Sequence, residues 1–283
     1  MALLDTAART LKRRLVGQVR GVLNDAAKGE APVVRSADGL FAPDSVVWRV
    51  HGDVTTMMVG GVAALLLQML HPAVLAGVWD HSSFRGDMLG RLRRTARFIA
   101  VTSYAERAEA EAAIAKVREV HTRVRGTLPD GRAYAADDPS LLAWVHVSEA
   151  VSFLDAWIRY AEPDMPTADQ DRYFAEFAQI AQALGADPVP RSRAEADALV
   201  AAMRPELRVD ARTREVARMV LDQPPPSLAM APFQALAFRA AVDLLPDWAR
   251  RMQGLPGPRM ATPAVRFGTN GLASTLRWAF RSG

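Results

Sequence analysis

A histidine and two arginines occur at helical spacing near the middle of the chain. His121 belongs to an apolar stripe whose three- and four-residue steps are those of a buried helical face, so we expect its imidazole to point inward. The stripe consists of Ile114, Val117, His121 and Val124. Arg118 and Arg125 stand three residues before and four residues after His121, which places two guanidinium groups along the edge of that face. Because such cations repel each other and are costly to desolvate, the pattern predicts an anion that balances them.

A second polar set precedes this one in the chain. Arg91, Arg94 and Thr95 stand at i, i+3 and i+4, on a face shared with Leu92 and Ile99. Haem fits the combined set, because its iron binds a neutral imidazole, its macrocycle needs an apolar slot and its two propionates pair with arginine. The alternative is an ordinary helical surface, with solvated arginines and a core histidine that is hydrogen-bonded locally.

The other histidines have different surroundings. His146 is in line with Leu142, Glu149 and Phe153 on a predicted helix, where it would either hydrogen-bond within the site or replace His121 as the ligand. His71 stands at a helix end, where a role in the turn is expected, and His51 and His81 fall among predicted loop residues. Glu149 and Asp155 are six residues apart, a poor spacing for one helical face, so no carboxylate pair is predicted.

Helices joined by short loops are predicted to carry these residues. The hydrophobic periodicity predicts helices over residues 3–24, 54–70, 87–102, 104–125, 139–160, 168–184, 192–203, 211–221 and 228–252. Four of these helices have a predicted N-terminal cap. The caps are Asp138 before Pro139 and the capping boxes that begin at Ser103, Thr167 and Ser192. The segment 127–134 contains Asp130-Gly131 and predicts a small hairpin. The fold class is therefore all-α, with residues 1–283 forming one globular multi-helix domain around the haem.

Composition excludes several classes of site and partner. The chain has 283 residues, half of them hydrophobic, and its 35 basic and 31 acidic residues are dispersed, which argues against nucleic-acid binding. It has no cysteine, which excludes disulfides, zinc-thiolate and iron–sulfur sites, thiolate-ligated haem and covalently attached c-type haem. No Gly-rich phosphate loop, HExxH or GxSxG motif occurs.

Two segments are relevant to whether the protein spans or contacts a membrane. Residues 54–70 form 17 residues without a charge, the short end of the range for a bilayer span, but Gln68 and the absence of basic flanks favour a buried core helix. The amphipathic segment 3–24 contains Lys12, Arg13 and Arg14 and is either a helix laid on the domain or a peripheral membrane contact. No signal-peptide pattern is found, so we expect a cytoplasmic protein without a transmembrane segment.

Several motifs together resemble the catalytic domain shared by latex-clearing rubber oxygenases and the mycophenolic-acid-pathway oxygenase, once catalogued as a domain of unknown function. The matching pieces are WRVHGD at 48–53, HPAV from 71, RLRRT at 91–95, REVHTRVRG at 118–126, YAADDP from 134 and WVH at 144–146. The resemblance is strongest over residues 60–185 and weaker on both sides. No single piece is diagnostic, but their order and spacing are fairly specific.

The resemblance implies an all-helical fold around a non-covalent b-type haem, with His121 as the proximal iron ligand. Arg118 and Arg125 match the arginines that flank that histidine, and Arg91 and Thr95 match distal positions. Arg94 replaces a lysine of the rubber-cleaving members. Because an arginine stays protonated and cannot ligate iron, we expect the sixth iron position to hold water or to stay open.

The first hypothesis is thus a haem b-dependent oxygenase. His121 would hold the iron, and O₂ and a small apolar substrate, such as an unsaturated or terpenoid molecule, would meet near Arg91, Arg94 and Thr95. A haem desaturase or peroxidase would use the same site. The alternatives from other classes are a haem carrier without turnover and a helical interaction protein without a cofactor, which would be colourless.

Overall fold

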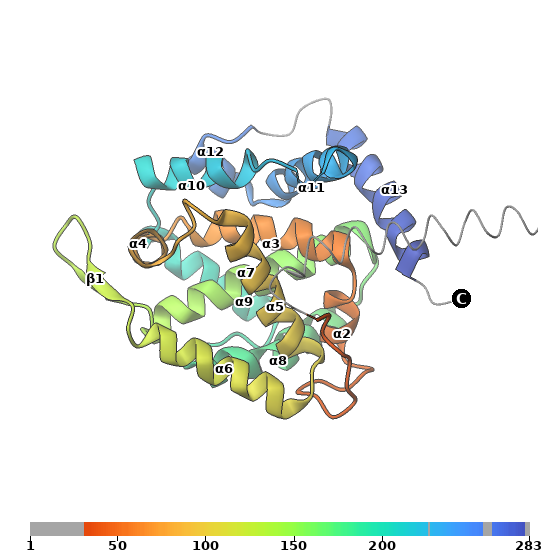
Figure 1. Cartoon of the computed structure of the whole chain (residues 1–283), viewed down its shortest axis with the longest axis horizontal. Helices are drawn as coiled ribbons and strands as arrows, with labels where there is room; N and C mark the ends of the chain where they lie inside the picture. The colour runs from red at the N-terminus through yellow and green to blue at the C-terminus, as the bar shows by residue number, and fades with distance from the viewer. Residues whose placement is uncertain (1–30, 226, 257–261, 281–283) are drawn as a thin grey trace, which may run out of the picture.

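The computed structural model describes residues 31–225, 227–256 and 262–280, and over these ranges it is a bundle of α-helices with one two-stranded sheet (Figure 1). The elements are α2 (Val46–His51), α3 (Val54–Gln68), α4 (Pro72–His81), α5 (Met88–Tyr104), α6 (Arg107–His121), β1 (Arg125–Thr127), β2 (Ala133–Ala135), α7 (Pro139–Tyr160), α8 (Thr167–Leu184), α9 (Arg193–Met203), η2 (Arg204–Glu206), α10 (Ala211–Leu221), η3 (Leu228–Met230), α11 (Ala231–Leu244), α12 (Asp247–Gln253) and α13 (Thr262–Phe280). The all-helical fold class is confirmed. The predicted segment 3–24 lies outside the described residues.

Helices α3 and α7 pack on each other at the centre of the bundle. Both are buried along most of their length, because their sequences contain long runs without charge. Helices α8 and α9 also pack on α7, and α11 and α13 pack on α3. The prediction of a buried core helix at 54–70 is therefore confirmed.

By length and hydropathy, α7 is the single described helix that could cross a membrane, and two thirds of its apolar window, 67%, is buried inside the protein. Helices α3 and α4 together would also pass such a test, but they are bent by 103° at the break between them. Burial of this kind is typical of core helices. The described residues therefore contain no clear membrane-spanning segment.

Two of the four predicted helix caps are confirmed and two are wrong. The Asp138 carboxylate accepts hydrogen bonds from the backbone N–H of the first turn of α7, and the Ser192 hydroxyl accepts one at the start of α9. Ser103 instead lies inside α5, which continues to Tyr104, and Glu106 precedes α6 without a side-chain cap. Thr167 is the first residue of α8, so its hydroxyl does not cap that helix.

Helix boundaries differ from prediction where the chain turns. The helix predicted over 104–125 ends at His121, because the following residues enter the hairpin, in which Arg125 pairs with Ala135 and Thr127 with Ala133. The helix predicted over 228–252 is divided into α11 and α12 at Pro246, which has no N–H to continue α11. Short helices α2 and α4 and the C-terminal α13 were not predicted.

Candidate active site

Helices α5 and α6 carry most of the predicted site residues. They meet at Ala105–Glu106 and diverge from there as the two arms of a V (Figure 1). Helix α5 packs on α2, and α6 packs on α8, whereas neither arm packs extensively on α7. Each arm of the V is therefore supported mainly by a helix other than α7.

The helix faces of this region are incompletely covered. No residue of α5 between positions 91 and 100 is fully buried, although Leu92, Ala96 and Ile99 form an apolar face there. On α7, every residue from 141 to 154 is buried except Val145 and Glu149, which lie one turn apart on the same face. Leu92 and Ile99 are partly buried and pack against the main hydrophobic core, so the protein itself covers part of this face of α5.

His121 is the last residue of α6 and is half-buried. Its Nδ1 atom is fully buried and has no hydrogen-bond partner among the described residues. Burial lowers the pKa of the imidazole, and the nearby Asp137 carboxylate opposes this shift only in part. Its lowered pKa favours the neutral ring near pH 7, and a neutral imidazole whose buried Nδ1 atom has no partner among the described residues fits a metal ligand.

Arg118 and Arg125 are both exposed, but they are not on the same helical face as predicted. Because α6 ends at His121, Arg125 lies in β1, where its Nη2 atom pairs with Asp137 at 2.7 Å. Asp137 thus balances this exposed cation within the protein. Arg118 has no ion pair or hydrogen bond with any residue that the structure describes and remains available to an external anion.

Arg91, Arg94 and Thr95 lie in the N-terminal half of α5. Arg91 is half-buried and donates a hydrogen bond to the Ser82 hydroxyl at 3.0 Å; burial and the charge of Arg94 lower its pKa. Arg94 is exposed and pairs with Asp87 at 3.4 Å, and Thr95 is also exposed. Among the described residues, no hydrogen bond or ion pair connects this set with His121, Arg118 or Arg125.

His146 lies on α7 and is only 6% exposed. Its Nε2 atom is buried without a partner in the described part of the chain, and burial lowers its pKa to about 4. Its ring centroid lies 4.8 Å from that of Phe177. Both roles predicted for His146, a partner within the site and an alternative ligand, therefore remain compatible with its environment.

His51 was predicted to lie in a loop, and this is wrong. It ends α2 and is buried, with its Nδ1 atom 2.8 Å from the Ser103 hydroxyl and its Nε2 atom 3.0 Å from the Tyr173 hydroxyl. Burial, with a smaller contribution from His146, lowers its pKa to about 3. His51 thus joins α2, α5 and α8 at the apex of the V. The apolar spacing of Val47, Val50 and His51 was the signal that could have revealed it.

Glu149 is the other residue whose environment the sequence did not reveal. It and Asp155 have separate partners, so the expectation that they form no carboxylate pair is confirmed: Asp155 pairs with Arg193 at 2.5 Å. Glu149 is half-buried, and its single described partner is the Gln68 side-chain amide, whose Nε2 donates at 3.4 Å. Burial raises the pKa of Glu149 to about 7.

Comparison with known protein families identifies the chain. The family model described as "ER-bound oxygenase mpaB/B'/Rubber oxygenase, catalytic domain" matches residues 48–278. The chain belongs to this family. No curated protein and no solved structure gives a significant match. The match to the mpaB/rubber oxygenase family includes every predicted site residue, from Arg91 to His146.

The residues of this mpaB/rubber oxygenase domain fit a haem better than a bare metal ion. In the ranges that the structure describes, no group of three or more histidine, cysteine or acidic side chains could hold a metal ion. A haem iron needs only one or two protein ligands, because the porphyrin supplies the others. Such a cofactor would use His121, whose buried Nδ1 atom has no hydrogen-bond partner among the described residues, and Arg118, which pairs with no residue that the structure describes.

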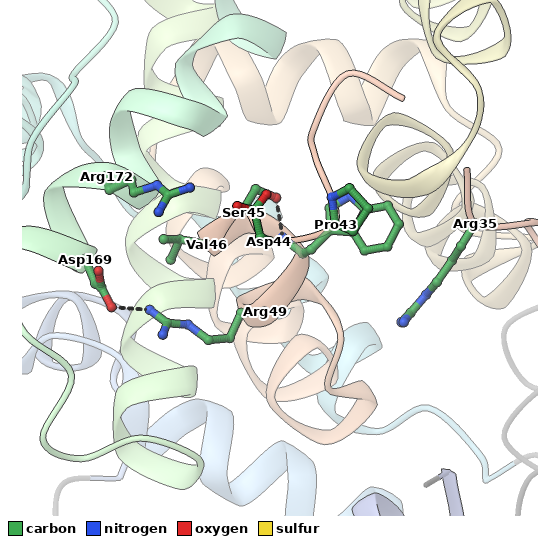
Figure 2. A pocket seen from close by; sticks show the side chains of 9 residues that line it. Arg35, Pro43, Asp44, Ser45, Val46, Arg49, Asp169 and Arg172 are labelled. Carbon is green, nitrogen blue, oxygen red and sulfur yellow. Dashed lines mark hydrogen bonds and ion pairs between the residues drawn. The ribbon is translucent and has the colours of Figure 1, made fainter. Parts of the chain in front are cut away.

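A pocket of about 380 Å³ lies elsewhere, next to α2 and the start of α8 (Figure 2). It contains none of the predicted site residues. Its arginines are already engaged: Arg49 pairs with Asp169 at 2.5 Å, Arg172 bonds to Glu176 at 2.7 Å, and Arg35 stacks on Tyr104. Acidic partners neutralise Arg49 and Arg172, and the aromatic contact holds Arg35, so this pocket offers little to an oxygenase substrate.

Proposed function

We propose that this family member is a haem b-dependent oxygenase, with His121 as the iron ligand and a small apolar molecule and O₂ as substrates. The observation that supports it most directly is the half-buried His121 imidazole, whose pKa is lowered by burial and whose Nδ1 atom has no hydrogen-bond partner among the described residues. A buried polar atom is rarely left unsatisfied without a functional reason. The family description supports oxygen chemistry.

The chain's own residues would bind and orient the reactants. His121 would hold the cofactor through one ring nitrogen, and Arg118 would pair with a carboxylate of the haem. Arg91, held by Ser82, would present a fixed positive charge at the far end of α5. The apolar face of Leu92, Ala96 and Ile99 would receive an apolar substrate and exclude water. When bound, haem supplies the redox-active iron that protein side chains lack.

The deciding experiment is an absorption spectrum of the protein expressed with a haem precursor. We expect a Soret band in the wild type and in His146→Ala, and loss of the band in His121→Ala. Loss only in His146→Ala would transfer the ligand role to α7, and a colourless wild type would refute the haem proposal.

A second measurement separates an oxygenase from a haem carrier. An oxygenase should retain haem when mixed with an excess of apomyoglobin and should consume O₂ when reduced. Rapid transfer of haem to apomyoglobin without O₂ consumption would instead support the carrier function.

A further inference from the structure

Helix α4 lies at the open side of the V, opposite the apex where α5 and α6 meet (Figure 1). The N-terminal half of α5, with Arg91, forms one side of this opening. The end of α6, with His121, and the hairpin of β1 and β2 form the other side. Among the residues that the structure describes, the two sides share no direct hydrogen bond or ion pair. A third element must therefore fix their separation.

The last two residues of α4 contact the hairpin. The Asp80 carboxylate accepts a hydrogen bond from the Tyr134 hydroxyl of β2 at 2.9 Å. His81, which the sequence placed in a loop, is the last residue of α4, and its Nε2 atom lies 3.1 Å from the Arg125 carbonyl of β1. Because a carbonyl oxygen can only accept, the His81 ring donates this hydrogen bond. One end of α4 thus contacts both strands of the hairpin.

The hairpin is in turn joined to His121. The Val124 N–H donates to the His121 carbonyl at 3.1 Å, and the Val124 carbonyl accepts from the Ala136 N–H at 2.9 Å. The Arg125 Nε atom donates to the Thr122 carbonyl at 3.1 Å. Three residues separate His121 from β1, and these hydrogen bonds hold them in place. A shift of the hairpin would therefore also shift the end of α6 and the His121 ring.

Tyr134 can reach Asp80 because the neighbouring strand has a glycine opposite it. Tyr134 pairs with Gly126, is only 5% exposed and packs on Ala73 and Ala76 of α4. A Cβ atom at position 126 would lie 2.6 Å from the Tyr134 hydroxyl oxygen, closer than atoms can approach. The absence of a side chain at Gly126 thus gives the ring its place between the hairpin and α4.

The residue that follows α4 contacts the opposite side of the opening. The Ser82 hydroxyl accepts a hydrogen bond from the Arg91 Nη1 atom at 3.0 Å. The Phe84 side chain, in the connection from α4 to α5, is fully buried and anchors that connection in the core. Residues 80–82 are consecutive, so one short stretch of chain contacts both sides of the V.

We propose that Asp80, His81 and Ser82 are positioning residues of the cofactor site, which hold Arg91 and the His121 imidazole at a fixed separation. Each acts through another residue, and none needs to touch the cofactor. This inference rests on the proposed haem-dependent function, because the separation matters only if one cofactor contacts both sides. His81 is the most informative position, since its side chain is exposed and its removal leaves no cavity in the core.

The first measurement tests the separation in the haem-free protein. Because the chain has no cysteine, spin labels can be attached selectively to Thr95→Cys on α5 and Val120→Cys on α6, two exposed positions. Pulsed electron paramagnetic resonance should give a narrow distribution of distances between the labels, and His81→Ala should broaden it. His81→Gln should restore the narrow distribution, because an amide N–H can also donate to the carbonyl.

The second measurement tests the consequence for the cofactor in unlabelled, haem-loaded protein. His81→Ala and Ser82→Ala should each release haem to apomyoglobin about tenfold faster than the wild type, a usual effect of losing a residue that orients a metal ligand. The ferric paramagnetic resonance signal should broaden in His81→Ala, because the His121 ring is held less uniformly. His81→Gln should restore both properties, which a general loss of stability would not predict.

Arg132→Ala is the matched control, because it breaks an exposed ion pair with Asp130 at the tip of the same hairpin, away from α4. It should change neither measurement. The proposal is overturned if His81→Ala keeps the wild-type distance distribution or the wild-type rate of haem release, or if Arg132→Ala changes either as strongly. A wild type without a Soret band would overturn the proposed function and this role with it, and the haem-free distances distinguish that failure from a failure of the contacts themselves.

Discussion

At the scale of single residues, three histidines differ in the hydrogen bonds that their rings make. His51 uses both ring nitrogens in hydrogen bonds to Ser103 and Tyr173, whereas His121 and His146 each keep a buried nitrogen without a described partner. Burial lowers the pKa of all three rings. Neutral imidazoles without local partners are suited to ligand binding, and a fully bonded imidazole is suited to joining helices.

The burial of His146 predicts a loss of stability in mild acid. The ring is neutral in the folded protein down to about pH 4 but takes up a proton near pH 6.5 when unfolded, so the unfolded state binds more protons below pH 6.5. The free energy of unfolding should therefore fall between pH 6.5 and 4.5, and His146 contributes about 2 kcal/mol to this fall by linkage. Glu149 acts in the opposite direction, because its raised pKa stabilises the folded state as the pH falls below 7.

The two contributions are separated by comparing variants. The free energy of unfolding of the haem-free protein is measured in urea at pH 6.5 and at pH 4.5. Between these two pH values it should fall less for His146→Leu than for the wild type. Glu149→Gln should show a larger loss, because the compensating carboxyl group is gone. Equal losses in the wild type and His146→Leu would show that this ring is not a buried neutral group.

At the scale of elements, the start of α7 positions the central helix. Asp138 accepts hydrogen bonds from the backbone N–H groups of Ser140 and Leu141 and from the Ser140 hydroxyl. Asp138→Ala should lower the free energy of unfolding by about 1 kcal/mol, the usual cost of removing such a cap. Chemical denaturation measures this difference.

Thr167→Ala provides the matched control, since this residue belongs to a predicted capping box that the structure does not contain. The substitution leaves every backbone hydrogen bond of α8 in place, so it should change stability by less than about 0.5 kcal/mol. If Thr167→Ala were as destabilising as Asp138→Ala, the hydroxyl would cap α8 after all.

At the scale of the whole molecule, one buried carboxylate joins the central and C-terminal helices. Asp243 of α11 is 8% exposed and accepts from Arg159 of α7 at 3.1 Å and from Arg266 of α13 at 2.9 Å. Arg250 of α12 lies 4.0 Å away and donates to the Asp243 carbonyl. The Asp243 carboxylate therefore attracts arginines from three other helices, and its negative charge offsets the repulsion between those arginines.

Asp243→Ala should be strongly destabilising, because it leaves Arg159 and Arg266 without their shared anion, whereas Arg250 keeps its ion pair with Asp247. We expect a loss of about 3 kcal/mol in urea unfolding, at the low end for a broken buried ion pair since two of the arginines are partly exposed. Arg266→Gln should cost about 1 kcal/mol or less, because this guanidinium is about half exposed. Similar costs for the two variants would argue against the shared role of Asp243.

The sequence by itself determined the fold class, the buried character of α3, the caps at Asp138 and Ser192, and the family to which the chain belongs. These properties depend on local order along the chain, since periodicity, turn residues and motif spacing are all short-range features. The ion pair between Arg125 and Asp137 was not predicted, because it depends on the hairpin that follows α6.

Only the tertiary structure decided the protonation state and partners of the site residues. Arg125 does not lie on the predicted helical face, because α6 ends at His121. His51 and Glu149 have hydrogen-bond partners on helices that are far away in the sequence. The physical reason is that desolvation depends on every atom packed around a group, and those atoms come from Gln68 on α3, Ser103 on α5 and Tyr173 on α8. No local pattern around Glu149 contains that information.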